Sequence, residues 1–172
     1  MTADKILNND IELDLILQRQ IDVPKDKVWK ALTEPELVKE WFCPKPWKTT
    51  ECRIDLRPGG EFYTNMQGPD GEGHSGASCF LEIVPQERLV WTTSLQPGYR
   101  PSPLPATDAH SCESLMFTCI ITLAEKDGGT KYVAHVMHST PEQKIQHEEM
   151  GFEEGWGATI TQLEELLKHE KV

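Results

Sequence analysis

The feature that most constrains the fold is an apolar stripe in the last thirty or so residues, from Ser139 to Lys168. The stripe is formed by residues that share one face of a helix: Ile145, Phe152, Trp156, Ile160, Leu163 and Leu167. Thr140 is a suitable N-cap, Pro141 suits the first helical position, and Gln143 completes a capping box. The pattern predicts one long helix packed against an apolar surface. At about 1.5 Å per residue it would reach roughly 40 Å, enough to cross a small domain.

Three glycines lie inside this predicted helix, at Gly151, Gly155 and Gly157. Each costs about 1 kcal/mol relative to alanine in a helix interior. One explanation is that they make room for a ligand or for a closely packed strand. The other is a kink, or a break near Gly151 that divides the segment into two helices. The sequence leaves both explanations open.

The chain before this helix alternates between apolar and polar residues, which is typical of strands with one buried face. The first predicted strand covers 11–23. Pro24 and Pro35 then open two short predicted helices, and the rigid segment from Cys43 to Trp47 leads to the next strand. Six further strands, joined mostly by hairpin turns, are predicted at 51–57, 62–66, 73–84, 89–95, 114–125 and 131–139.

This order of elements predicts an α+β fold. A curved antiparallel sheet of about seven strands has one apolar face to cover, and the C-terminal helix is the only element long enough to cover it. A sheet wrapped around a single helix leaves an apolar cavity between the two. We expect a flexible tail at 1–10 and a single domain at 11–172.

A long loop is predicted at 96–111, where four prolines interrupt any periodicity. It joins the fifth and sixth strands, at one open end of the wrapped sheet. One interpretation is a lid over the mouth of the cavity, with Tyr99 as its inner face. The other is a surface insertion without a role.

Charge and composition limit the partners. The formal net charge is −11 and no run of lysine or arginine occurs, which argues against nucleic acid or an anionic membrane as partner. No apolar run is long enough to span a membrane, and residues 1–10 lack a signal-peptide core, so we expect a cytoplasmic protein. The cysteines are odd in number, show no paired spacing and are expected to be buried thiols: Cys43, Cys52, Cys79, Cys112 and Cys119.

Four short patterns occur along the chain in a fixed order: Pro24, Val28-Trp29, Ala31-Leu32-Thr33 and Pro35; Trp41 followed by Pro44; Arg57-Pro58-Gly59-Gly60 with Phe62; and Glu82-Ile83-Val84-Pro85 with Glu87-Arg88-Leu89. Glu154-Gly155-Trp156, with Leu163 beyond it, completes the set. In this order they resemble the START-like, birch-pollen-allergen-like (SRPBCC) superfamily. More specifically, they resemble homologues of the activator of the heat-shock protein 90 ATPase. The resemblance covers about 11–167.

The resemblance implies the helix-grip fold, in which a curved sheet grips a long C-terminal helix. We expect a single-domain member, without the additional client-binding domain of the members named for chaperone activation. The implied partners are a small hydrophobic ligand in the cavity or a chaperone. The oligomeric state is expected to be a monomer or a homodimer.

No convergent set of catalytic residues is recognisable in the sequence. The nearest approach to a hydrolase nucleophile motif, from Gly73 to Ala77, lacks its final glycine and precedes a strand rather than a helix. His135 and His138 share a strand but differ by three positions, so they face opposite sides of the sheet and one at most points inward. We therefore expect no metal, no cofactor and no catalytic residue.

Aromatic and soft side chains are the candidates for the wall of the cavity: Trp41, Trp47, Met66, Trp91, Tyr99, Phe117, His135, Met137, Phe152 and Trp156. Plain core packing is the alternative for each. The expected function is binding of a small hydrophobic or aromatic ligand, or cochaperone-like binding of a protein. The alternative is a cyclase- or aromatase-like enzyme, with Glu82 or His135 in proton transfer. Neighbouring buried titratable groups in the lining would favour the enzyme, and an apolar lining would favour the binding protein.

Overall fold

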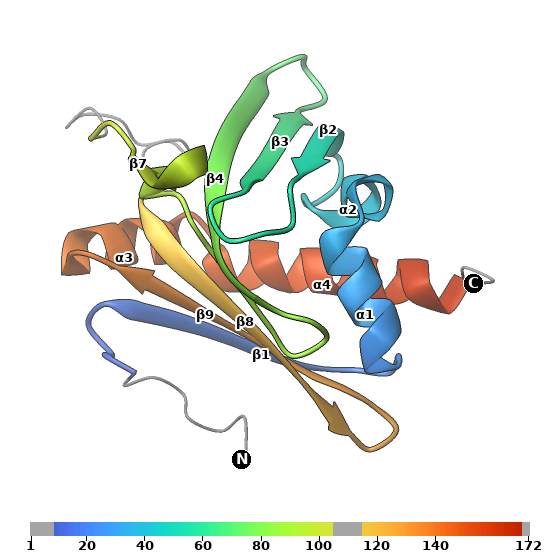
Figure 1. Cartoon of the computed structure of the whole chain (residues 1–172). Coiled ribbons are helices and arrows are strands. Elements are labelled where there is room, and N and C mark those ends of the chain that lie inside the picture. The colour runs from blue at the N-terminus through green and yellow to red at the C-terminus, as the bar shows by residue number, and fades with distance from the viewer. Residues whose placement is uncertain (1–8, 105–114, 170–172) are drawn as a thin grey trace.

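The computed structural model describes residues 9–104 and 115–169 of the chain. Seven strands form one antiparallel sheet in the order β1-β9-β8-β5-β4-β3-β2. The strands are β1 Asp14–Ile21, β2 Lys48–Ile54, β3 Glu61–Gln67, β4 Gly73–Val84, β5 Arg88–Thr92, β8 Phe117–Lys126 and β9 Gly129–His138. The sheet curves around the long helix α4 (Phe152–His169), as Figure 1 shows. This arrangement confirms the predicted α+β helix-grip fold.

The first two strands lie at opposite edges of the sheet although they follow one another in the chain. Two short helices, α1 (Lys25–Thr33) and α2 (Pro35–Trp41), carry the chain from one edge to the other (Figure 1). The following strands then return across the sheet until β9 pairs with β1 along its full length. The two predicted short helices therefore form the connection between the two edge strands.

Alternation along β9 decides which of its side chains face the core. Tyr132, Ala134 and Val136 are all buried. In the neighbouring strand β8 the buried residues Leu123 and Ile121 pair with Tyr132 and Ala134. Because successive side chains of a strand point to opposite faces, the even-numbered positions of β9 face α4 and the odd-numbered positions face away.

The apolar stripe of the C-terminal helix packs as the sequence predicts. Its buried members are Phe152, Ile160, Leu163 and Leu167, and Trp156 is partly buried against the same core. A polar clamp fixes the helix to the segment after α2: the side-chain amide of Gln162 donates to the carbonyls of Trp41 and Cys43 (3.1 and 2.9 Å) and accepts from the Lys45 N–H (3.0 Å). Helix α4 is thus held by apolar contacts on the stripe and by hydrogen bonds at one flank.

The C-terminal segment is two helices, α3 (Pro141–Glu149) and α4, rather than one continuous helix. The break is at Gly151, whose φ of 88° lies in the left-handed region that glycine adopts without strain. Thr140 caps α3 by accepting from the Gln143 N–H at 3.2 Å, as expected. The Gln143 side chain, however, accepts from the Met116 N–H instead of completing a capping box. Because the break turns α3 away from the axis of α4, Ile145 is 48% exposed and does not extend the stripe.

Several boundaries differ from the sequence prediction, among them those of β2, which ends at Ile54 and not at 57, and of β5, which ends at Thr92 and not at 95. Strand β1 begins at Asp14 instead of residue 11, because a turn closed by the Leu13 N–H on the Asp10 carbonyl precedes it. The described part of the predicted loop contains a short hairpin, β6 (Leu95–Gln96) and β7 (Arg100–Pro101), around the single turn η1 (Pro97–Tyr99). The rest of that loop, and Cys112, lie outside the described residues. Among the described helices, none is long and apolar enough to cross a membrane.

The break at Gly151 can be tested by substitution. Gly151→Ala should lower the free energy of unfolding by about 1–2 kcal/mol, because a side chain is strained at a positive φ. Gly155→Ala is the matched control: Gly155 lies inside α4, and an added Cβ would meet no atom closer than Pro44 Cγ at 3.9 Å. We expect the control to raise the free energy by up to about 1 kcal/mol. Urea unfolding of both variants measures this, and equal effects would contradict the assignment.

Candidate functional site

A cavity of about 290 Å³ lies between the sheet, α2 and the junction of α3 with α4. Aromatic side chains dominate its wall: Trp41, Phe42, Phe62, Phe80, Trp91, Phe117, Tyr132, Phe152 and Trp156. The wall also includes Met66 and Met150, whose flexible side chains adapt to irregular shapes. The lining is mostly apolar and comes from elements at both ends of the chain.

Edge-to-face aromatic contacts connect the sheet side of the cavity to its helix side. Phe62 on β3 meets Trp91 on β5 at 5.3 Å between ring centroids, and Trp91 meets Phe117 on β8 at 5.5 Å. Phe117 then meets Trp156 on α4 at 6.1 Å. Such contacts are favourable beyond the apolar area that they bury. The wall is therefore a continuous aromatic chain from β3 to α4.

The glycines of α4 have different roles, and the missing side chain of Gly155 leaves space at the cavity. Gly155 lies one position before Trp156 at the cavity, and only Pro44 comes within 4 Å of where its Cβ would lie. Gly157 has a different role, because a Cβ there would approach Nη2 of Arg19 to 2.9 Å. Both explanations of the glycines therefore apply, each at its own position: a break at Gly151, space at Gly155 and close packing at Gly157.

Six of the ten residues proposed from the sequence lie at this cavity: Trp41, Met66, Trp91, Phe117, Phe152 and Trp156. Trp156 is only partly buried, because its ring also borders the cavity. The sequence thus identified part of the aromatic wall, since large apolar residues on inward-facing positions of strands and helices converge on the core. It did not propose Phe42, Phe62, Phe80 or Tyr132, which also line the cavity.

The other four proposed residues lie elsewhere. Trp47 stacks on His74, with ring centroids 5.5 Å apart. His135 and Met137 occupy odd-numbered positions of β9 and so lie on the face of the sheet away from α4. There the Nε2 of His135 lies 2.8 Å from a carboxylate oxygen of Asp14.

Tyr99 does not cover the cavity either, which removes it as the inner face of a lid. Its side chain is 51% exposed and lies over Gly59, where an added Cβ would come within 2.8 Å of the tyrosine ring. The Gly98 N–H donates to the Gly59 carbonyl at 2.8 Å. The hairpin of β6 and β7 is thus attached to the turn between β2 and β3. Glu82 is also remote from the wall, because it pairs with Arg88 on the surface.

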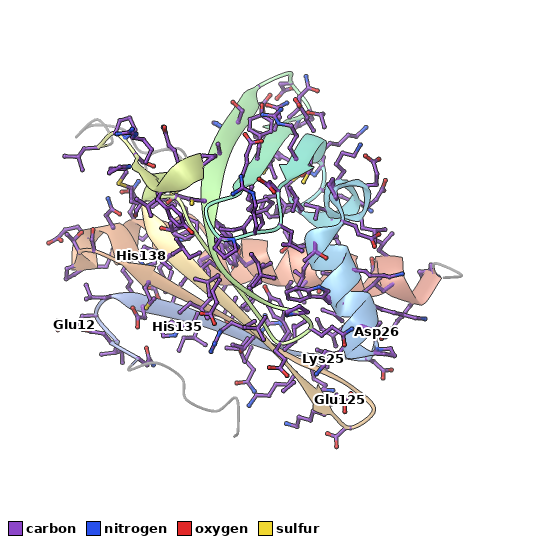
Figure 2. The ribbon with its side chains drawn as sticks, in the orientation of Figure 1. Glu12, Lys25, Asp26, Glu125, His135 and His138 are labelled. Carbon is purple, nitrogen blue, oxygen red and sulfur yellow. The ribbon has the colours of Figure 1, made fainter. Side chains whose placement is uncertain are left out.

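Sequence reasoning missed a titratable residue at the wall, His147 of α3. Its Nδ1 lies 2.9 Å from Nε2 of His138, whose Nδ1 lies 2.8 Å from the Leu13 carbonyl oxygen. Figure 2 shows His138 at the end of β9 that leads to α3, with His135 further back along the strand. The alternation of β9 indicates that His138 points inward. Nothing in the sequence indicates its partner, because His147 follows a turn whose geometry depends on packing.

Burial acts on both rings of this pair. Burial and, to a smaller extent, the proximity of His138 together lower the pKa of His147 to about 4. Burial also lowers the pKa of His138, although the Leu13 carbonyl and Asp14 oppose this change. Both rings are therefore neutral near pH 7. Among the described residues, no group of three or more ligating side chains is placed to hold a metal ion.

The histidine pair should make folding sensitive to acid. Both histidines take up protons near their ordinary pKa in the unfolded chain, at about 6.5, but not in the folded protein. Their contribution to stability is complete above about pH 6.5 and is lost as the pH falls toward the folded values. For His147 the loss is on the order of 2–3 kcal/mol. Urea unfolding of the wild type and His147→Phe between about pH 7 and pH 4.5 should show a shallower pH dependence in the variant; parallel curves would contradict this.

The comparisons with known proteins agree with the fold and with the resemblance. Residues 22–168 match the family model described as activator of Hsp90 ATPase homolog 1-like protein. A protein from Nitrosomonas europaea with a crystal structure is 53% identical in sequence to this chain. The match covers 95% of this chain and 99% of the other, with a TM-score of 0.87. No functionally curated protein matches.

Two more distant structures share the fold. A protein from Mycobacterium smegmatis is 23% identical over 94% of each chain, with a TM-score of 0.74. A solution structure from Arthrobacter aurescens is also 23% identical, over 95% of this chain and 91% of that chain, with a TM-score of 0.77. These two structures show the fold alone. The family match over 22–168 shows that the chain belongs to the family of activator of Hsp90 ATPase homolog 1-like proteins.

Proposed function

We propose that the protein binds a small hydrophobic or aromatic molecule in the cavity between the sheet and α4. The observation that carries this proposal is the aromatic wall around about 290 Å³ of space. Close-packed interiors rarely leave such a space, because lost contacts and unfilled volume reduce stability. A ligand that fills the space would restore those contacts.

The volume limits the size of the ligand. An apolar cavity of about 150 Å³ is enough to hold benzene. The cavity here is about 290 Å³, near the lower end of the range for ligand pockets. A compound of one or two rings therefore fits the space better than a long lipid.

A second candidate is proton-transfer catalysis of the cyclase or aromatase type in the same cavity. His147 favours it, because a titratable ring at the wall is the kind of group that such chemistry needs. The histidine pair meets the expected criterion only in part, because His147 lines the cavity and His138 lies behind it. A pKa of about 4 also makes His147 a weak base near neutral pH. We therefore rank catalysis below binding, and cyclisation of a polyketide by the wild type but not by His147→Phe would reverse that order.

A chaperone partner is a further proposal that rests on family membership alone. The cytoplasm remains the proposed location, supported by the free, buried thiols of the described cysteines Cys43, Cys52, Cys79 and Cys119. A direct test of the chaperone is a pull-down with purified heat-shock protein 90. Retention of the chaperone by the wild type and by cavity variants alike would place its binding surface outside the cavity.

Filling the cavity from α4 tests the binding proposal. Gly155→Leu places a side chain in the open space beside Gly155, so it should weaken binding of naphthalene at least about tenfold. Gly155→Ala is the matched control, because a single methyl group leaves most of the volume and should change the affinity by less than about threefold. Binding is measured by chemical-shift changes of backbone amides on titration with naphthalene. Undetectable binding by the wild type, or equal binding by Gly155→Leu, would contradict the proposal.

A further inference from the structure

The wall of the cavity contains an imidazole held in a fixed position by aromatic neighbours. The ring of His147 lies 5.1 Å from that of Phe117, 5.2 Å from that of Phe152 and 5.9 Å from that of Trp156, measured between centroids. The residue is buried and lines the cavity. Its orientation is therefore set by packing before any ligand arrives.

The hydrogen bonds behind this ring determine which of its nitrogens carries the proton. A carbonyl oxygen only accepts, so the Nδ1–H of His138 donates to the carbonyl of Leu13. In a neutral ring the other nitrogen is then an acceptor. Nε2 of His138 therefore accepts from the Nδ1–H of His147, at 2.9 Å. Nε2 of His147 is left with a lone pair and no proton.

Several other polar groups at the wall are already bonded within the protein. Nε1 of Trp41 donates to the carbonyl of Ala31 at 2.9 Å, and Oγ1 of Thr159 donates to the carbonyl of Trp156 at 2.7 Å. Nε2 of His147, by contrast, has no hydrogen-bond partner among the described residues. Among the described residues, no fully enclosed side-chain nitrogen or oxygen lacks a partner, so Nε2 is open to the cavity and not sealed in the core. A donor on a ligand that reaches it there gains a hydrogen bond.

We propose that the cavity selects a neutral aromatic or apolar molecule that carries one hydrogen-bond donor, a phenol-type hydroxyl or an N–H, directed at Nε2 of His147. This inference rests on the proposed binding function and specifies its ligand class. The ligand donor extends the chain that runs from the Leu13 carbonyl through both histidines. A carboxylate is excluded, because its oxygens would face the lone pair.

The charge state of the pair supports this selectivity. Burial lowers the pKa of His147 to about 4, so the acceptor is available at neutral pH. The charged groups that act on His138 have opposing effects: Asp14 raises its pKa, and Lys144 lowers it. Protonation of either ring would replace the acceptor at the wall by a donor or a cation, and so the preference for donor ligands should disappear in acid.

A matched pair of probes tests the inference. 2-Naphthol carries the hydroxyl donor, and 2-methoxynaphthalene has the same rings without it. The wild type should bind 2-naphthol about tenfold more tightly, which corresponds to one hydrogen bond made in a site with little water. His147→Phe keeps an aromatic ring at the wall and should bind both probes equally. His135→Gln is the control, because His135 lies on the other face of the sheet and its loss should leave the preference unchanged.

The outcomes separate this inference from the binding function on which it rests. Equal affinity of the wild type for both probes would overturn the inference and leave the cavity as a general apolar site. Failure of the wild type to bind either probe would overturn both. If His147→Phe does not fold, nitrogen-15 NMR of the wild-type imidazoles answers the same question. We expect an unprotonated Nε2 on His147 that changes its chemical shift with 2-naphthol; a protonated Nε2 in the free protein would overturn the inference.

Discussion

The packing of α4 against the inner face of the sheet is the interaction on which the rest of the structure depends. The buried residues Phe152, Ile160, Leu163 and Leu167 supply the apolar side of that contact. Each buried side chain of this size contributes on the order of 1.5–3 kcal/mol. Gln162 adds a fixed attachment to the segment that follows α2. Because the cavity lies between the sheet, α2 and the start of this helix, the position of the helix determines where the cavity lies.

The cavity is a consequence of how α4 begins. Gly151 ends α3 and lets the chain turn, so that His147 and Phe152 face one another at 5.2 Å between ring centroids. Gly155 then leaves the next turn of the helix without a side chain at the wall. A leucine at Gly155 would fill part of the same space. Gly151, at the break before α4, and Gly155, inside α4, thus shape the cavity end of the helix that packs on the sheet.

The sequence predicted the fold well because periodicity is a local signal. The alternation in β1 and the stripe on α4 each specify a buried face without knowledge of the partner. The same logic found Trp91, Phe117 and Trp156, which face the cavity. It was wrong for His135 and Met137, because a shift of one position along a strand moves a side chain to the other face.

The rest of the site depends on tertiary contacts that have no sequence pattern. Tyr99 was expected to cover the cavity but lies on Gly59, because the hairpin that carries it is attached to a neighbouring turn. The pairing of His138 with His147 joins a strand to a helix across a turn. Only the folded positions of both elements bring Nε2 of His138 to 2.9 Å from Nδ1 of His147.

The central claim is that the space beside α4 is a binding site and not a packing defect. Native mass spectrometry of the protein purified from its own host tests this most directly. The account predicts a population of wild-type protein that carries one small molecule, released on collisional activation, and no such population for Gly155→Leu. Wild-type protein found only at its bare mass, or the same added mass on Gly155→Leu, would contradict it.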